Sequence, residues 1–184
     1  MKEGKICTFF ADTPLGKMQA AASDKADPRS AALCGLWFVG QKYFPQSTET
    51  WIEKPDYPVF VLLRTWLKEY FSGRKPETKL PLLPDGTDFQ KAVWNLLLEI
   101  PYGKTSTYGV IAARLVSRDK KAPAQAVGGA VGHNPISLLI PCHRVLGADG
   151  SLTGYAGGLE KKRALLELEK APISTAARGK PLRP

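Results

Sequence analysis

The sequence predicts an α+β protein, with a small antiparallel sheet and a helix first and a mostly helical region second. Strand-like apolar runs end near residue 39, whereas the apolar residues from 59 onward recur at helical spacing. Between the two regions, the stretch 72–86 is rich in proline and glycine, which is typical of a linker. We therefore expect a support domain with its linker at 1–84, a second domain at 85–170 and a disordered basic tail at 171–184.

The first domain is expected to contain an antiparallel sheet and one helix. A helix is predicted at 59–71 from its apolar spacing, and the stretch 41–57 is expected to be irregular. Cys7 and Cys34 fall in strand-like runs and are interpreted as core residues rather than catalytic ones. Strands are predicted at 6–10, 17–22 and 32–39.

The second domain begins with three predicted helices. Thr87 is a suitable cap for a helix at 88–100, and further helices are expected at 108–115 and 124–133. The polar, basic stretch 117–123 separates the last two. Two helices joined by a basic turn are the plan of a helix-turn-helix DNA-binding domain, so a helix-turn-helix fold of the winged-helix-like kind is expected here.

The third of these helices has an unusual composition. Gln125 is followed by Ala126-Val127-Gly128-Gly129-Ala130-Val131-Gly132, and each glycine costs about 1 kcal/mol in a helix relative to alanine. Such a helix lacks the long polar side chains that recognise base edges in the major groove. Its small residues would instead allow a partner to approach the backbone closely.

The rest of the second domain contains less regular structure. An extended apolar segment is expected at 136–140, and the stretch 147–158 is predicted to form a glycine-rich loop. Loops of this length are usually functional or disordered. A final helix is predicted at 159–169.

Composition limits the function classes. The net charge is +9, and +6 of it falls after residue 84, which favours a polyanionic partner such as nucleic acid. We expect no membrane association, because no apolar run reaches transmembrane length. Three irregularly spaced cysteines suit a reducing, cytoplasmic location. With only two histidines, a spaced Cys/His cluster is not evident, so we expect no metal and no other cofactor.

The segment Ile140-Pro141-Cys142-His143-Arg144-Val145 carries the clearest chemical signal. A thiolate is a strong nucleophile, and cationic neighbours lower the pKa of a thiol, so the pattern predicts a reactive Cys142 with a lowered pKa. The alternative is a buried structural cysteine, since free cysteine is among the most buried residue types.

This segment resembles the alkyl-acceptor motif of the O6-alkylguanine-DNA alkyltransferases. Two more segments resemble the same family at its spacing: Ala126-Val127-Gly128-Gly129-Ala130 with Asn134-Pro135, and Gly154-Tyr155-Ala156-Gly157-Gly158-Leu159. The resemblance is strong over 87–169 and weaker before it. It implies a repair protein that extrudes O6-alkylguanine from double-stranded DNA, and we expect this protein to be a monomer.

The same resemblance implies the chemistry. The alkyl group is transferred irreversibly to Cys142, so each molecule acts once as a methylated-DNA–protein-cysteine S-methyltransferase. His143 would take the thiol proton through a water molecule, and a glutamate would orient its ring. The Gly-Gly-Leu register places that glutamate at Glu169, with Glu167 as the nearby competitor. Tyr108 would donate to the leaving base, and Asn134 would tie the third helix to the acceptor segment.

The resemblance also implies a DNA- and base-binding surface. The one clear departure from the family is Gln125, which stands where many relatives have an arginine that fills the gap left by the extruded nucleotide. Ala156 stands where some relatives have a hydroxyl. The expected contacts are Gln125, Ala126, Gly128, Gly129, Arg144, Tyr155, Ala156 and Gly157. For Arg144, a structural ion pair is the alternative to a phosphate contact.

Two other function classes remain open on sequence grounds. Cys142 and His143 could serve a cysteine hydrolase, although adjacent residues are poorly placed for direct proton transfer. The helix-turn-helix pattern also suits a DNA-damage-binding module without catalysis, a class whose family members lack the acceptor cysteine.

Overall fold

The computed structural model describes residues 5–23, 31–116 and 123–173. The chain divides into two compact units, which are treated separately below. One unit is Met1–Asp85 together with Pro135–Ser137, and the other is Gly86–Asn134 together with Leu138–Pro184. The short segment Pro135–Ser137 thus belongs to the N-terminal unit although it lies far along the chain.

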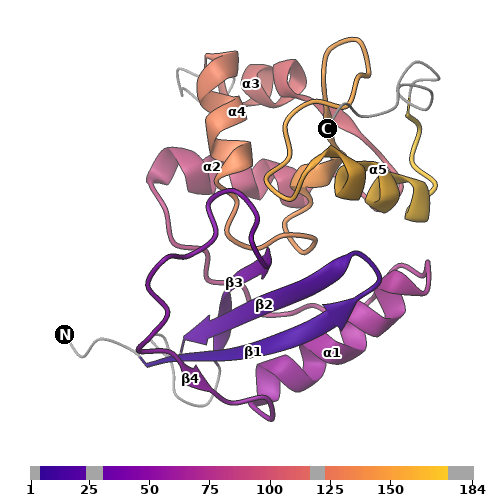
Figure 1. The fold of residues 1–184 in the computed structure, drawn as a ribbon. Helices are drawn as coiled ribbons and strands as arrows, with labels where there is room; N and C mark the ends of the chain where they lie inside the picture. Colours follow the sequence, from indigo (N-terminus) through magenta and orange to yellow (C-terminus); the bar gives the residue numbers. More distant parts are fainter. Residues whose placement is uncertain (1–4, 24–30, 117–122, 174–184) are drawn as a thin grey trace. The chain divides into compact units, whose positions relative to one another are not determined.

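A mixed sheet forms the N-terminal unit, with strands in the order β3-β2-β1-β4 (Figure 1). The β1–β2 and β2–β3 pairs are antiparallel, as predicted, but β4 runs parallel to β1. The sheet is therefore not purely antiparallel, and part of the stretch expected to be irregular is a strand. The strands are β1 Ile6–Thr13, β2 Gly16–Ser23, β3 Ala32–Phe38 and β4 Ile52–Glu53.

Helix α1, Pro58–Phe71, runs along one face of this sheet (Figure 1). Pro58 suits the first turn because its missing N–H would have no partner inside the helix. Phe60 is fully buried and its ring centroid lies 5.5 Å from that of Phe9 on β1. The apolar face of α1 and the inner face of the sheet thus form the core of this unit.

The segment Pro135–Ser137 pairs with β3. Leu36 donates its N–H to the carbonyl of Pro135 at 2.9 Å, and Ser137 donates to the carbonyl of Leu36 at 2.8 Å. The prediction of an extended run over 136–140 is wrong beyond this point, because the chain turns at 137–139 and Leu138 has a φ of 69°. A leucine in this left-handed region is strained, so the surrounding structure must enforce it.

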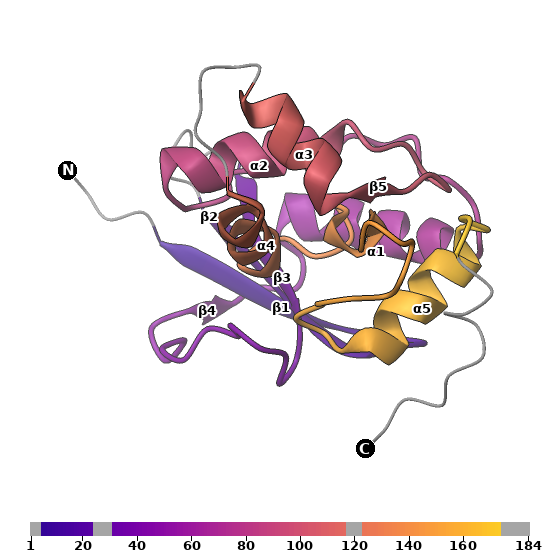
Figure 2. The ribbon, with the colours of Figure 1, turned by 90° about the horizontal axis from the view of Figure 1, so that it is seen from above.

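Helices α2, α3 and α4 pack against one another in the second unit (Figure 2). The buried Trp94 of α2 donates its indole N–H to the carbonyl of Ala130 in α4 at 2.8 Å. Strands β5 and β6 form a short parallel pair. The elements are α2 Asp88–Leu98, β5 Ser106–Thr107, α3 Tyr108–Val116, α4 Ala124–Gly132, the 3-10 helix η1 Cys142–Arg144, β6 Val145–Leu146 and α5 Leu159–Leu168.

The chain remains ordered beyond α5 for a few residues. Ala171 and Ile173 are buried in a cluster with Leu146 and Leu166, so the expectation of a disordered tail is wrong at its start. The apolar side chains at these positions explain the difference, because they extend the core of the second unit. The remainder of the expected tail, 174–184, lies outside the described residues, as does most of the basic turn expected at 117–123.

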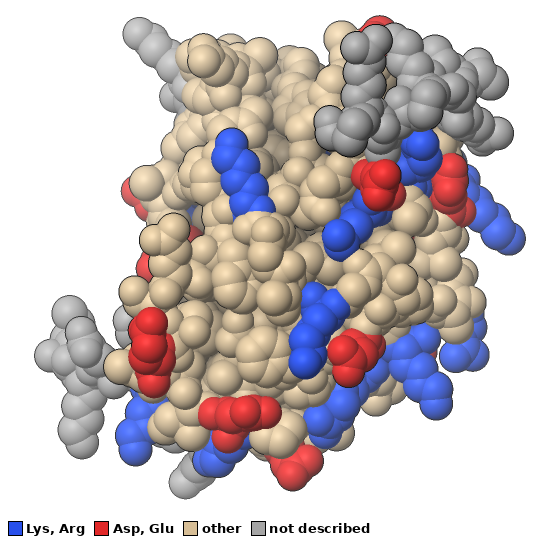
Figure 3. Space-filling view, in the orientation of Figure 1, with Lys and Arg blue, Asp and Glu red and all other residues tan. Residues whose placement is uncertain are grey.

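Charge is mixed on the surface seen in Figure 3, where basic and acidic side chains are interspersed. Within the described ranges, no helix has the length and apolar character needed to cross a membrane. The same residues contain no group of His, Cys, Asp and Glu side chains arranged to hold a metal ion.

A capping box starts helix α2 and offers a test of its stability. The Thr87 hydroxyl accepts from the N–H of Gln90 at 3.2 Å, and the Gln90 side chain accepts from the N–H of Thr87 at 2.8 Å. Thr87→Ala should lower the free energy of unfolding by about 1 kcal/mol in urea titrations. Thr87→Ser is the matched control because it keeps the hydroxyl. Equal losses in both variants would show that the cap does not stabilise the helix.

Candidate active site

Cys142 opens the 3-10 helix η1 and has a free, buried thiol. Pro141 precedes it with φ −81° and ψ 63°, and the N–H of Cys142 donates to the carbonyl of Ile140 at 2.8 Å. These values define an inverse γ-turn, for which the fixed φ of proline is well suited. The turn sets the direction in which the Cys142 side chain leaves the backbone.

Asn134 contacts both ends of this turn. Its side-chain amide donates to the carbonyl of Ile140 at 2.7 Å and to the sulfur of Cys142 at 3.0 Å. Asn134 itself follows the last turn of α4. A single buried side chain therefore joins the end of α4 to the cysteine, and its N–H stabilises negative charge on the sulfur.

The predicted lowering of the Cys142 pKa is wrong for this structure. Burial raises the pKa of the Cys142 thiol, and the Asn134 amide and the Lys162 charge only partly oppose it. The physical reason is desolvation, which disfavours the thiolate more than these neighbours favour it. Cys142 is thus a protonated thiol at rest.

The imidazole of His143 contacts the carboxylate of Glu169. Its Nε2 lies 2.8 Å from Oε1 of Glu169, and both side chains are fully buried. Since a carboxylate accepts, we assign the proton to Nε2, which makes Nδ1 the nitrogen that carries the lone pair. Burial lowers the pKa of His143, although the hydrogen bond to Glu169 raises it in part, so the ring is a neutral base at rest.

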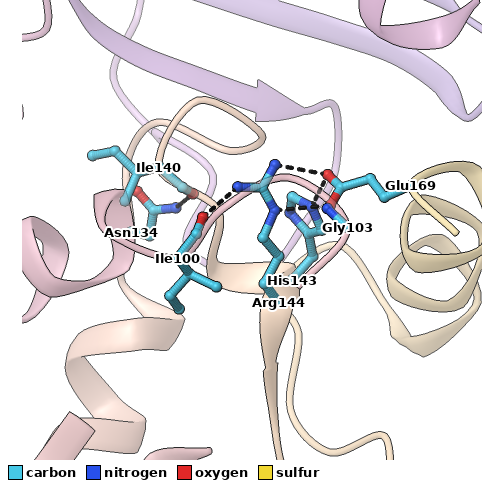
Figure 4. A network of polar contacts seen from close by, with 7 residues as sticks. All are labelled: Ile100, Gly103, Asn134, Ile140, His143, Arg144 and Glu169. Carbon is cyan, nitrogen blue, oxygen red and sulfur yellow. Dashed lines mark hydrogen bonds and ion pairs between the residues drawn. The ribbon is translucent and has the colours of Figure 1, made fainter. Parts of the chain in front are cut away.

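Arg144 clamps the other side of the same carboxylate (Figure 4). Its Nε donates to Oε2 of Glu169 at 2.8 Å, its Nη2 donates to Oε1 at 2.9 Å, and its Nη1 donates to the carbonyl of Ile100 at 2.7 Å. The guanidinium is therefore directed into the protein, which favours an ion-pair role over the expected DNA contact. Glu167, the alternative glutamate, is exposed.

The charge of Glu169 is secured by its neighbours. Burial alone would raise the pKa of Glu169, but hydrogen bonds from His143 and Arg144 together with the charge of Arg144 hold it well below its ordinary value. The backbone N–H of Gly103 also donates to Oε2 at 3.1 Å. Gly103 has a φ of 71°, and a Cβ there would lie 2.9 Å from the carbonyl oxygen of Glu169. Glycine is thus required where this loop approaches the site.

Tyr108 starts α3 and reaches the loop that precedes α5. Its hydroxyl donates to the carbonyl of Thr153 at 3.2 Å and lies 3.4 Å from that of Gly154. Burial raises the pKa of Tyr108, and the charge of a Cys142 thiolate would raise it further. The tyrosine therefore lies within electrostatic range of the cysteine and is a phenol at neutral pH.

Lys162 is a site residue that sequence reasoning missed. Its buried ammonium donates to the carbonyls of Val145 at 2.5 Å and Thr153 at 2.6 Å. Burial lowers the pKa of Lys162 to about 8, whereas the charge of a Cys142 thiolate would raise it. Helical spacing could have identified this residue, because it places Lys162 on the same face of the predicted helix as Leu165, Leu166 and Glu169. A lysine on an apolar helix face is unusual.

Helix α4 presents small residues at its surface. Gln125, Ala126 and Gly129 are exposed, and Gly128 is half-buried. A Cβ added at Gly128 or Gly129 would meet nothing within 4 Å. Packing inside the described chain therefore does not require glycine at either position.

The loop before α5 contains the remaining expected residues. Tyr155, Ala156 and Gly157 are half-buried, and the N–H of Gly158 donates to the carbonyl of Tyr155 at 3.0 Å. Gly158 has a φ of 92°, a conformation that only glycine adopts readily. This turn delivers the chain into α5 and thereby places Lys162 and Glu169.

Known proteins match both parts of the chain. Residues 88–171 match the family described as 6-O-methylguanine DNA methyltransferase, DNA binding domain, and residues 6–84 match its ribonuclease-like domain. A methylated-DNA–protein-cysteine methyltransferase of Haemophilus influenzae is 49% identical over 136 residues, which cover 73% of each chain. One from Mycobacterium tuberculosis is 44% identical over 160 residues, covering 87% of this chain and 90% of the relative.

Solved structures agree with these matches. The crystal structure of Mycobacterium tuberculosis O6-methylguanine methyltransferase has a TM-score of 0.75 and 41% identity, covering 93% of this chain and 98% of that one. The structure of Mycobacterium tuberculosis OGT in complex with DNA has a TM-score of 0.74 and 43% identity, covering 90% and 94%. The chain therefore belongs to the 6-O-methylguanine DNA methyltransferase family, binds DNA and acts in DNA repair as a methyltransferase whose acceptor is a protein cysteine.

Proposed function

We propose that the chain extrudes O6-alkylguanine from double-stranded DNA and transfers the alkyl group irreversibly to its own Cys142. The observation that carries this proposal is the pair of buried contacts at the cysteine: Asn134 donates to the sulfur at 3.0 Å, and the neighbouring His143 contacts Glu169 at 2.8 Å. A buried nucleophile beside an oriented neutral base suits displacement at a saturated carbon. An alkylated base in duplex DNA must leave the stack to reach such a site.

The proposed reaction moves one proton and one alkyl group. Nδ1 of His143 takes the thiol proton, through a water molecule, as the sulfur attacks the alkyl carbon. The bond from that carbon to O6 breaks, and its electron pair stays with guanine, which is finally protonated on nitrogen by the proton released at His143. The thioether at Cys142 is stable, so the molecule is used once.

Tyr108 is proposed to stabilise the leaving base. Its hydroxyl donates to the carbonyl of Thr153 at rest and would exchange that acceptor for the guanine, which gains negative charge as the bond breaks. Tyr155, Ala156 and Gly157 would line the pocket for the base, with a methyl group at Ala156 in place of a hydroxyl donor.

DNA contact is assigned to the exposed face of α4. Gln125, Ala126, Gly128 and Gly129 offer a surface of small side chains with room above the glycines, which suits close approach in a narrow minor groove. Arg144 is left out of this surface because its guanidinium is buried against Glu169.

The two domains are proposed to have different roles. The region 85–170 would hold the DNA-binding and alkyl-acceptor residues, and the region 1–84 would support it by pairing β3 with Pro135–Ser137. A monomer is sufficient, since every group invoked above comes from one chain. A reducing, cytoplasmic location fits the need for a free thiol at Cys142.

Replacing the nucleophile tests the assignment directly. Cys142→Ser should abolish methyl transfer from a duplex containing O6-methylguanine, because a buried serine hydroxyl is far less acidic than a thiol, while DNA affinity stays close to wild type. Intact-mass measurement followed by peptide mapping should show one added methylene mass on the Cys142 peptide of the wild type. Cys34→Ser, which changes a half-buried cysteine of the N-terminal unit, is the matched control and should still gain this mass. A methylated Cys7 or Cys34 peptide in Cys142→Ser would refute the assignment.

The stability of the fold should depend on pH through His143. The pKa of its buried ring is lowered from 6.5, so the unfolded chain binds more protons just below that pH and stability is lost as the pH falls. The slope from this one group is at most about 1.4 kcal/mol per pH unit. Urea unfolding at several values between pH 7 and 5 should show a steeper loss in wild type than in His143→Gln. Parallel curves would contradict a neutral buried ring.

Gln125 should limit repair in duplex DNA. Glutamine can hydrogen-bond to an orphaned base but lacks the charge and the stacking plane of a guanidinium. Gln125→Arg should therefore raise the single-turnover rate on duplex substrate, by about tenfold if it recovers 1.4 kcal/mol of the extrusion cost, and should change the rate on single strands much less. An unchanged or lower duplex rate would show that another residue holds the DNA open.

A further inference from the structure

The arginine beside the nucleophile is better placed to tune the proton acceptor than to bind DNA. Its side chain is 11% exposed and meets the fully buried Glu169 through two nitrogens, with Nε 2.8 Å from Oε2 and Nη2 2.9 Å from Oε1. This is the parallel, two-pronged geometry in which arginine binds a carboxylate most strongly. The same Oε1 lies 2.8 Å from Nε2 of His143, so the arginine and the imidazole share one oxygen.

Sharing that oxygen has an electrostatic consequence. A buried carboxylate beside a histidine normally favours the protonated ring, because the imidazolium then neutralises it. Here Arg144 already supplies one positive charge to the carboxylate, and a second positive charge on His143 would be repelled by it. Burial is the main reason for the ring to stay neutral, and Arg144 adds a second by opposing the effect of the acidic partner.

Other charged or titratable groups near His143 and Glu169 also affect the protonation of the His143 ring. Lys162 of α5 disfavours a charged His143, as Arg144 does. Tyr102, in the loop after α2, is coupled to Glu169 and Arg144, but the pKa of its phenol is raised, chiefly by burial, so it is neutral at ordinary pH. Cys142, the neighbouring residue, is protonated at rest because burial raises the pKa of its thiol. Arg144 contacts Glu169 directly.

Arg144 is itself held in place by the loop that follows α2. Its Nη1 donates to the carbonyl of Ile100 at 2.7 Å, and its guanidinium carbon lies 5.7 Å from the centre of the Tyr102 ring. A lysine could supply the charge but could not make the two-pronged contact and reach the Ile100 carbonyl together. The position therefore uses both the charge and the shape of arginine.

We propose that Arg144 is a positioning residue of the methyl-transfer site, which keeps His143 neutral and oriented by sharing the Glu169 carboxylate with it. The proposal rests on the proposed function in one respect, that a neutral His143 accepts the proton of Cys142. Removing the charge of Arg144 should let the His143–Glu169 pair take up a proton at higher pH. The pair would then be unable to accept the thiol proton at pH values where the wild type still can.

The test is a proton NMR titration of the histidine rings in the full-length protein without DNA. The chain has two histidines, so the resonances of His133 serve as an internal reference. In Arg144→Gln the titration midpoint of His143 should move up by about one pH unit. In Arg144→Lys it should move much less, because the charge remains. Arg114→Gln is the matched control, since Arg114 pairs with Glu99 at the surface of the same unit.

A second measurement links the titration to repair. In Arg144→Gln the acid limb of the single-turnover methyl-transfer rate should move upward by the same interval as the His143 midpoint. In Arg144→Lys the rate should fall at all pH values without a comparable shift, because orientation is impaired and charge is not. A uniform fall in Arg144→Gln, with the midpoint in place, would reduce Arg144 to a structural ion pair and overturn the proposal.

The outcomes also separate this inference from the reaction itself. A shifted midpoint in a protein that never methylates Cys142 would support the charge sharing and refute the proposed chemistry. Should Arg144→Gln fail to fold, two results can still overturn the proposal: a wild-type His143 midpoint at or above 6.5, which contradicts a neutral ring, or an Arg144→Lys rate equal to that of the wild type. Circular dichroism of each variant at the start and end of the titration shows whether the variant is folded.

Discussion

The buried carboxylate of Glu169 is the interaction on which the reaction centre depends. It accepts hydrogen bonds from His143, Arg144 and the backbone of Gly103, so the end of α5, the 3-10 helix η1 and the loop after α2 meet at one group. A buried charge without partners is strongly unfavourable, and removing one partner of a buried pair typically costs about 3–5 kcal/mol. The same contacts therefore hold the local fold together and orient His143, the residue proposed to accept the thiol proton.

The sequence predicted which residues meet at the candidate site better than it predicted the pKa of the Cys142 thiol or the direction of the Arg144 side chain. Spacing of the glycine motif led to Glu169 rather than Glu167, and the structure puts Glu169 against His143 and leaves Glu167 exposed. The thiol pKa could not be predicted in the same way, because a motif of cationic neighbours says nothing about how far the sulfur is buried. The direction of the Arg144 side chain could not be predicted either, because its guanidinium donates to the carbonyl of Ile100, a residue distant in sequence.

Local sequence patterns predicted the secondary structure correctly except where contacts between distant parts of the chain determine it. Long strands and helices were predicted within a few residues, because their apolar periodicity is strong. Strand β4 has two residues and no period to detect. The run after Asn134 is apolar, yet Pro135–Ser137 pairs with β3 and Leu138 turns the chain with a positive φ. Ile173 packs against the core although its neighbours in sequence resemble a tail.

Burial of the thiol has a consequence for the working life of the protein. Under the proposed chemistry each molecule accepts one alkyl group, so any side reaction of Cys142 removes it from service. Oxidants and small electrophiles consume cysteines in proportion to their thiolate character and exposure. A sulfur that stays protonated and enclosed at rest reacts slowly with such reagents. Burial therefore protects the resting thiol from side reactions, and under the proposed chemistry Cys142 would stay intact until an alkylated base reaches it.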